Sequence, residues 1–412
     1  MTIHPMISAL RRHKASVVLI VLQIALTLAI VCNAMFIISQ RIQRVNRSTG
    51  VNAQDLYLVS QQWVDAPTSD DAASIQKLDA MQLEDLAALR ALPDVASVSP
   101  VNALPLYGQT MGSIAFVPDS SLMSNAIRST YYFGDDHFLP TLGLHLLAGR
   151  NFNAGDVGHK GADSHTQAAT AMVNKALADR LFPQGDAVGK IVYLNGRSTP
   201  TTIIGVIENL RTTSGMSFDR YSVVEPMRLN SVYSYYAVRA KPGRLLAAMR
   251  ATAPALYKVD PLRVLDDDSV QSFADIRSAA HHADVGMAAL MSVICLILLA
   301  VTAAGIVGLT SFWVDQRQRQ VGIRRALGAR KVDILRYFQM ENLFIAGIGA
   351  VVGVVLAIGL NLLLMKHYEI AHMPMFYVLI GVAVVLLLGQ CAVFVPARQA
   401  SNVPPVVATR SV

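Results

Sequence analysis

The sequence has few charged residues and few cysteines for its length. Asp, Glu, Lys and Arg make up 15% of its 412 residues, whereas soluble domains carry about 25%. The mean hydropathy is +0.41, which argues against an ordinary soluble enzyme. The three cysteines, Cys32, Cys295 and Cys391, all lie in apolar runs. We therefore expect neither a disulfide framework nor a cysteine-ligated zinc site.

Motifs of hydrolases and nucleotide-binding proteins are also missing. Neither GxSxG nor HExxH occurs. Residues 185–190 approach a phosphate-binding loop, but one residue too few separates the glycines, and Ile191 stands where a hydroxyl would hold magnesium. The triplet Asp266–Asp268 lacks the ligand spacing of a calcium loop. We expect no catalytic, metal or cofactor site in this chain, and a membrane-anchored enzyme has no support.

Four long apolar runs predict four membrane-spanning helices. Each reaches or approaches the ~20 residues that a helix needs to cross a bilayer. None contains a charged residue, which disfavours an ion-coupled carrier, because such carriers need titratable groups within the membrane. The first run is longer than the apolar core of a signal peptide, so we expect it to be retained. The predicted spans are residues 15–38, 285–314, 342–365 and 376–395.

The short segments that flank these runs differ in charge. Twelve basic residues lie in residues 1–14, 315–341 and 396–412, whereas the loop 366–375 contains only Lys366. Since basic residues concentrate on the cytoplasmic side, we expect both termini and residues 315–341 to be cytoplasmic and the loop 366–375 to lie outside. The net charge of +7 is then a topology signal, so no nucleic-acid partner is predicted.

Residues 39–284 are predicted to form a large extracytoplasmic α+β domain between the first two helices. Alternating and helical patterns indicate two strand–helix–strand units, near residues 52–102 and 231–266, around a middle subdomain. Within the first unit the helix is expected over residues 82–92. Asn195-Gly196 is a hairpin turn signal in the middle subdomain. Residues 271–284 have helical spacing and are expected to form a stalk that continues into the second span.

The cytoplasmic segment 316–341 is basic and amphipathic. Gly328 is expected to separate two short helices. Composition alone is equally consistent with a basic helix lying on anionic lipid headgroups. The apolar positions are Val321, Ile323, Leu327, Val332, Leu335 and Phe338.

This segment resembles the coupling region of MacB/FtsX-type ABC-transporter permeases. Residues 319–335 read RQVGIRRALGARKVDIL, close to the family pattern REIGIRRALGA-xx-DIL, with Gln320 in place of the family's Glu. Three stretches of the outer segment resemble the extracytoplasmic core domain of the same family. They are residues 147–152, 172–182 and 188–205.

The resemblance implies a permease subunit of a bacterial inner membrane, with one helix before and three after a MacB-like periplasmic domain. It implies a second permease, as homodimer or paralogous heterodimer, and two copies of a separate ABC ATPase that bind ATP and Mg. Such a permease exports or extrudes a peptide, antibiotic, toxin or lipid-linked substrate by mechanotransmission, in some cases with a periplasmic adaptor and an outer-membrane channel. The alternative is an FtsX-like transmitter that activates an extracytoplasmic partner such as a cell-wall hydrolase.

The same resemblance suggests which residues couple to the ATPase. Apolar anchors are expected to enter a groove of the ATPase, arginines to pair with acids around it, and Gly328 to allow a turn where a side chain would clash. A small-residue face at Gly349 and Gly353 is expected to pack helices closely. The coupling candidates are Val321, Gly322, Ile323, Arg324, Arg325, Leu327, Gly328, Arg330 and Asp333.

Overall fold

The chain folds into two compact units in the computed structural model. One unit is Asn46–Ala283, and the other combines Met1–Val45 with Asp284–Val412. The predicted turn Asn195-Gly196 lies outside the described residues. The structure describes residues 14–107, 111–116, 126–162, 164, 166–194, 199–212, 219–368 and 372–402.

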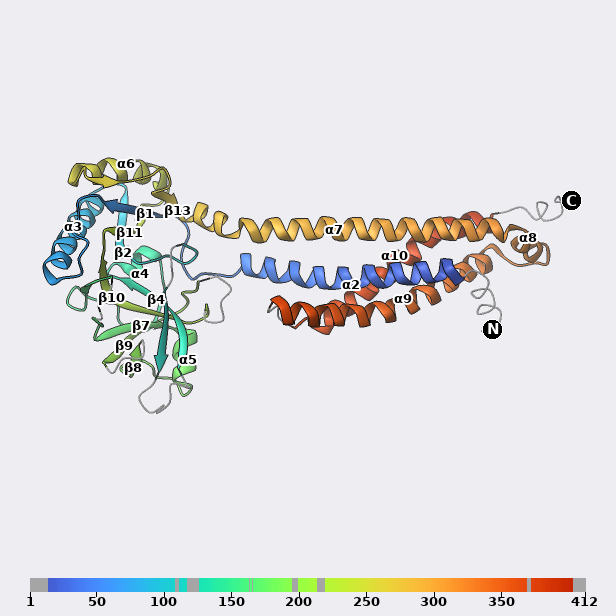
Figure 1. The fold of residues 1–412 in the computed structure, drawn as a ribbon, viewed down its shortest axis with the longest axis horizontal. Coiled ribbons are helices and arrows are strands. Elements are labelled where there is room, and N and C mark those ends of the chain that lie inside the picture. Colours follow the sequence, from blue (N-terminus) through green and yellow to red (C-terminus); the bar gives the residue numbers. More distant parts are fainter. Residues whose placement is uncertain are drawn as a thin grey trace. The chain divides into compact units, whose positions relative to one another are not determined.

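Four helices are long and apolar enough to cross a membrane. They are α2 (Lys14–Val45), α7 (Phe273–Gln316), α9 (Lys331–Tyr368) and α10 (Met375–Ser401), with the short α8 (Gln318–Ala326) between α7 and α9 (Figure 1). The helices α2, α7 and α9 extend well past the apolar runs, because hydropathy marks only the part suited to hydrocarbon. The expected stalk is the first part of α7, which runs without a break into the second span.

Helix α2 packs closely on α9 and α10 through small residues. A Cβ added at Gly349 would lie 2.8 Å from Ile24 Cγ2, and one at Gly353 would lie 2.9 Å from Leu28 Cδ2. On α10, a Cβ at Gly381 would collide with Cys32 Sγ. The absence of side chains lets the backbones approach, which is how helices gain packing energy in lipid.

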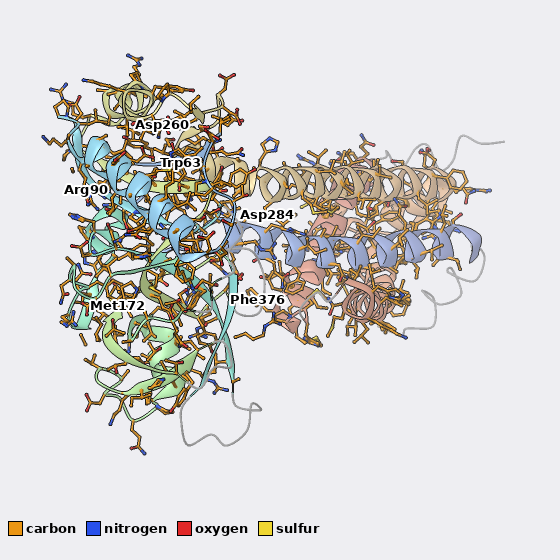
Figure 2. The ribbon with its side chains drawn as sticks, turned by 60° about the vertical axis from the view of Figure 1, so that its left-hand side comes forward. Trp63, Arg90, Met172, Asp260, Asp284 and Phe376 are labelled. Carbon is orange, nitrogen blue, oxygen red and sulfur yellow. The ribbon has the colours of Figure 1, made fainter. Side chains whose placement is uncertain are left out.

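Helix α7 is attached differently. Of its most apolar stretch 17% is buried, compared with 56% for α2. Polar contacts join the two helices: the hydroxyls of Thr27 and Thr302 lie 2.7 Å apart, and Gln23 Nε2 donates to Val301 O over 3.1 Å. Near the end of α2, Arg41 forms an ion pair with Asp284 of α7. Asp284 is labelled in Figure 2. Most of the apolar face of α7 is therefore not covered by this chain.

The unit Asn46–Ala283 contains a five-stranded antiparallel sheet with order β12-β1-β11-β2 and β13 beside β1. Both predicted strand–helix–strand units contribute to it, since β1 pairs with β11 from Leu56↔Arg239 to Gln62↔Tyr233. Helix α3 begins ten residues before the expected start, because the Asp71 side chain caps it by accepting from two backbone N–H groups. The elements are β1 (Leu56–Trp63), α3 (Ala72–Arg90), β2 (Val95–Val101), β11 (Tyr233–Ala240), α6 (Leu245–Val259), β12 (Arg263–Val264) and β13 (Val270–Ser272).

The middle segment forms a second sheet of eight strands. Seven strands follow the order β4-β3-β8-β9-β7-β10-β6, and β5 pairs with β9 beside this path. Pairing of β4 with β10 closes six of the strands into a ring. Buried residues of both sheets share one core, to which Met172 of β7 belongs (Figure 2). The elements are β3 (Met111–Phe116), β4 (Ile127–Gly134), α4 (Phe138–Leu142), β5 (Leu146–Gly149), β6 (Gly158–Gly161), β7 (Thr170–Asn174), α5 (Lys175–Leu181), β8 (Ile191–Leu194), β9 (Pro200–Ile207) and β10 (Ser222–Asn230).

The predicted pairing in the middle segment is present. Strand β8 pairs antiparallel with β9, with Ile191 opposite Thr202. Residues 185–190, the near match to a phosphate loop, form the turn before β8, where Gly185 and Gly189 adopt φ values of +84° and +83°. The Gly189 N–H donates to Ile203 O over 2.7 Å, so these glycines shape a turn beside the sheet.

Candidate functional site

The turn between α8 and α9 depends on one glycine. Gly328 has φ +97°, a conformation that costs glycine little and other residues much. A Cβ on Gly328 would meet nothing within 4 Å in this chain, so the backbone conformation is the reason for glycine that the structure shows, and the expected clash against an ATPase stays a prediction. The expected second short helix is also wrong, because Lys331 starts α9, which continues for 38 residues.

Asp333 has a structural role at the start of α9. Its Oδ2 accepts the backbone N–H of Arg330 over 3.0 Å. An acidic residue in the first turn that bonds back to the capping residue stabilises a helix start. Asp333 therefore fixes where α9 begins and how the preceding turn is held.

One face of α8 packs against its own chain. Val321 is 7% exposed, and it belongs to the same core as Trp313, Ile334 and Phe338. Gly322 is also buried. The prediction that Val321 inserts into a partner is therefore corrected: helical spacing gave α8 an apolar stripe, but this part of the stripe is already covered.

The other side of the segment is open. Ile323 is 48% exposed and Leu327 is 83% exposed, and Gly328 and Arg330 are exposed beside them. The guanidinium of Arg324 lies 5.0 Å from the centre of the Tyr337 ring, a cation–π contact that limits its orientations. Arg325 is partly buried and interacts within the chain. The structure thus combines exposed apolar side chains with arginines held in position.

An ion pair that was not expected from the sequence anchors the base of α8. Arg317 Nη1 lies 2.9 Å from Glu341 Oε2 and 3.0 Å from Oε1, and both side chains are largely buried. Arg317 caps α8, whereas Glu341 belongs to α9. The only signal in the sequence was an acidic residue directly before an apolar run. The pair connects α8 to α9 at the end opposite Gly328.

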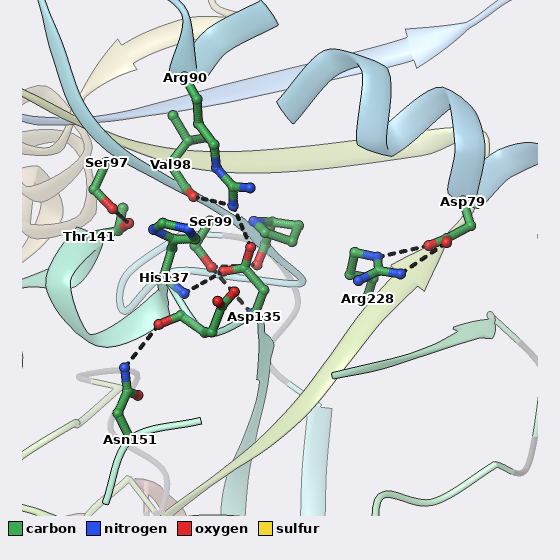
Figure 3. Close-up of polar contacts among 12 residues, drawn as sticks. Asp79, Arg90, Ser97, Val98, Ser99, Asp135, His137, Thr141, Asn151 and Arg228 are labelled. Atoms are coloured by element: carbon green, nitrogen blue, oxygen red, sulfur yellow. Dashed lines mark hydrogen bonds and ion pairs between the residues drawn. The ribbon is translucent and has the colours of Figure 1, made fainter. Parts of the chain in front are cut away.

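In the outer unit, α3 is connected to both sheets. Asp79 accepts two hydrogen bonds from Arg228 of β10, at 2.8 and 2.9 Å, and Arg90 lies 2.6 Å from Asp135 (Figure 3). Burial acts to raise the pKa of Asp79, but the hydrogen bonds and charge of Arg228 outweigh it and lower that pKa. Burial raises the pKa of Asp135 although Ser99 and Arg90 act in the opposite direction.

A second carboxylate of α3 is fully buried. Asp85 Oδ1 lies 2.9 Å from Arg263 Nη2, and neither side chain is exposed. Asp85 Oδ2 also accepts from Gln61 over 2.6 Å and from the Tyr236 hydroxyl over 3.0 Å. In the part of the chain that the structure describes, no group of three or more His, Cys, Asp or Glu residues is arranged to hold a metal. These networks join the helix to the sheets.

Comparison with known proteins identifies the family of both units. Residues 17–256 match the MacB-like periplasmic core domain, and residues 292–405 match the FtsX-like permease C-terminal region. The macrolide export ATP-binding/permease protein MacB 2 of Aeromonas hydrophila is 28% identical over 98% of this chain and 59% of its own length. The pyoverdine export ATP-binding/permease protein PvdT of Pseudomonas syringae is 27% identical over 80% of this chain and 48% of its own.

The chain therefore spans about half to three fifths of the length of these relatives. Among solved structures, the periplasmic region of MacB from Actinobacillus actinomycetemcomitans covers 57% of this chain and 97% of its own, with a TM-score of 0.35 and 13% identity. The first domain match alone includes more than half of the residues. The chain is a membrane protein that belongs to the MacB/FtsX-type family of ABC-transporter permeases.

Proposed function

We propose that this permease exports or extrudes a peptide, antibiotic, toxin or lipid-linked substrate, driven by a separate ABC ATPase that binds ATP and Mg. The observation that carries the proposal is the exposure of Ile323 and Leu327 beside arginines, in a segment that joins two apolar helices. Exposed apolar anchors with surrounding charges are typical of a docking interface. The relatives carry ATP-binding in their names, and this sequence has no phosphate-binding loop.

In this proposal, movement of the ATPase reaches the outer domain through rigid helices. The buried Val321 and the Arg317–Glu341 pair hold α8 on the helix bundle. Helix α7 is continuous over 44 residues, about 66 Å at the usual rise, and its first turn places Phe273 in the core of the outer unit. A push on α8 would thus be transmitted along α7, a physical link of the kind that coupling requires.

The proposal includes a topology and a dimer. Both termini and residues 315–341 are cytoplasmic, and Asn46–Ala283 lies outside, as the basic residues of the short segments indicate. The uncovered apolar face of α7 is available to a second permease, either identical or paralogous. A cysteine introduced at exposed Lys258 should react with an impermeant reagent from outside. Labelling only after the cytoplasmic side is opened would contradict the topology.

The coupling role is tested with Leu327→Asp and Ile323→Asp. A charge placed in an apolar contact is desolvated without a partner, so co-purification of the ATPase and ATP-dependent transport should both be lost. The control is Leu246→Asp, because Leu246 is 66% exposed on α6 of the other unit. If residues 316–341 only rest on lipid, both variants should still form an intact complex with the ATPase. ATPase binding at wild-type level in both variants would contradict the proposal.

A further inference from the structure

Four exposed apolar side chains meet at one end of the five-stranded sheet. Gln62 of β1 lies opposite Val264 of β12 on one side and opposite Tyr233 of β11 on the other. Two residues further along β1, the Val64 N–H donates to Leu262 O over 3.0 Å. Side chains of opposite residues, and of every second residue along a strand, point to the same face of a sheet. Val64, Tyr233, Leu262 and Val264 therefore share one face, which we call the strand-end patch.

The strand-end patch is open although the same strands are buried elsewhere. Its four side chains are 41% to 63% exposed. On the opposite face, Trp63 and Arg263 are buried, and Arg263 pairs with Asp85 of α3 (Trp63 is labelled in Figure 2). Nearer the start of β1, Leu56 and Leu58 lie on the face of the patch and belong to the core shared by both sheets. The patch is therefore the uncovered end of a face that is otherwise packed.

The chain segments on both sides of the patch continue into acidic residues. Asp65 directly follows Val64, and β12 is flanked by Asp260 on one side and by residues 266–268, all aspartates, on the other. Across the part of the chain that the structure describes, none of these five carboxylates forms an ion pair. Within residues 257–268, which the structure describes completely, Lys258 is the only exposed basic residue. The patch is thus an apolar surface with a negative border.

We propose that the strand-end patch binds a flexible peptide that combines apolar and basic side chains. The apolar side chains would cover the patch, and the basic ones would face the aspartates, so charge complementarity selects a cationic peptide. Size argues against a folded partner, because stable protein interfaces use about 20–30 residues on each side, whereas the patch offers four apolar side chains. The proposal narrows the substrate class of the proposed export function and rests on it for that role, but binding itself requires no ATPase.

The test uses the full chain in phosphatidylcholine nanodiscs, with empty nanodiscs as the blank for peptide that binds lipid. The probe is a short synthetic peptide of alternating leucine and lysine that carries a fluorophore and a photoreactive group. A second peptide has glutamate in place of lysine. We expect the lysine peptide to bind saturably above the blank and to cross-link to residues 62–65, 233 and 260–268. The glutamate peptide should bind about tenfold more weakly or less, because its charges are repelled by the aspartates.

A first pair of variants tests the apolar contribution. Val64→Ser/Leu262→Ser removes two aliphatic side chains from the patch and should weaken binding of the lysine peptide about tenfold or more, because less apolar surface is buried. Leu147→Ser/Ile191→Ser is the matched control, since these residues are exposed to a similar degree on the other sheet. The control should bind the peptide as wild type does.

A second pair tests the charges. Asp267→Asn/Asp268→Asn should weaken binding about threefold at low salt, and the difference from wild type should vanish at high salt, because exposed charges are screened. Glu84→Gln/Glu208→Gln removes two exposed charges elsewhere in the same unit and should leave binding unchanged.

Three results would overturn the proposal. The first is equal binding of the lysine and glutamate peptides, or equal binding by the variants and their controls. The second is cross-linking of the wild type only at other residues, a result that does not depend on whether a variant folds. The third is a shift of Val64→Ser/Leu262→Ser towards the monomer in light scattering, which would make a second copy of the chain the occupant. ATP-driven export in a chain that fails to bind the peptide would leave the export function standing and refute only this site.

Discussion

Arg317 and Glu341 form an ion pair whose side chains are 15% and 5% exposed, with 2.9 Å between Nη1 and Oε2. The two residues are 24 positions apart, and the pair joins the capping residue of α8 to α9. Since both groups are largely out of water, each is stabilised mainly by the other. The pair therefore holds the start of α8 against α9.

Replacing one partner of this pair should destabilise the membrane unit. Glu341→Gln leaves the Arg317 guanidinium buried without a counter-charge, and losses for such changes are about 3–5 kcal/mol. The double variant Arg317→Gln/Glu341→Gln should recover part of this loss. Thermal unfolding in detergent measures it, with exposed Arg319→Gln as the control. Single-variant losses that simply add in the double variant would show that the two groups do not interact.

Gly353→Leu should separate α2 from α9. An added side chain would meet Leu28 and the backbone of Ala25 at about the distances already found for a Cβ, 2.9 to 3.0 Å. Overpacking of this kind costs about 1–3 kcal/mol. Gly347→Leu is the matched control, because a Cβ at Gly347 meets nothing within 4 Å. Equal melting temperatures for the two variants would contradict the packing that the structure shows.

Gly328→Ala should destabilise the α8–α9 turn although space is available. Its φ of +97° lies in the left-handed region, where a Cβ costs about 1–2 kcal/mol. The control Gly359→Ala in α9 has open space and an ordinary φ, so it should be neutral or slightly stabilising. Hydrogen exchange of the amides in residues 326–333 would report the effect. Unchanged protection in Gly328→Ala would argue against strain.

Acid should weaken the contact between α3 and β10. The folded-state pKa of Asp79 lies below its ordinary value, so the unfolded chain binds the proton more readily. The contribution of the Asp79 carboxylate to stability is complete above the ordinary carboxyl pKa of about 3.9. It is lost as the pH falls through the pKa that Asp79 has in the folded state. Asp79→Asn should therefore lower the Tm at neutral pH, and the difference from wild type should shrink below about pH 4.

Asp135, in the same domain, should show the opposite pH dependence of stability. Its folded-state pKa is raised, mainly by burial, so its contribution is complete at low pH and declines as the pH rises through that value. The difference between wild type and Asp135→Asn should thus be larger in acid than at neutral pH. Melting curves of both variants over the same pH series test the two signs together. If the Tm of each variant ran parallel to that of wild type over the whole pH series, both pKa directions would be contradicted.

The four spans, the position of the outer domain and the family could be predicted from the sequence. A span is a property of contiguous residues, because about 20 apolar residues in a row must leave water. The motif in residues 319–335 could also be recognised from the sequence, because its residues are contiguous. Helix ends were less predictable: α2 continues to Val45 and α3 begins at Ala72, where capping and polar contacts, not hydropathy, decide.

Only the tertiary structure decided which side chains of these segments are available. Val321 and Leu327 are both apolar and share one motif, yet one is 7% and the other 83% exposed. The difference arises because Val321 belongs to the buried core that also contains Trp313 and Phe338 of other helices, whereas Leu327 does not. Likewise the backbone N–H of Arg211 bonds to Thr49 O only because the fold places residues 48 and 49 beside residues 209–211. Burial and charge pairing depend on which distant segments the fold brings together, and no local pattern of residues contains that information.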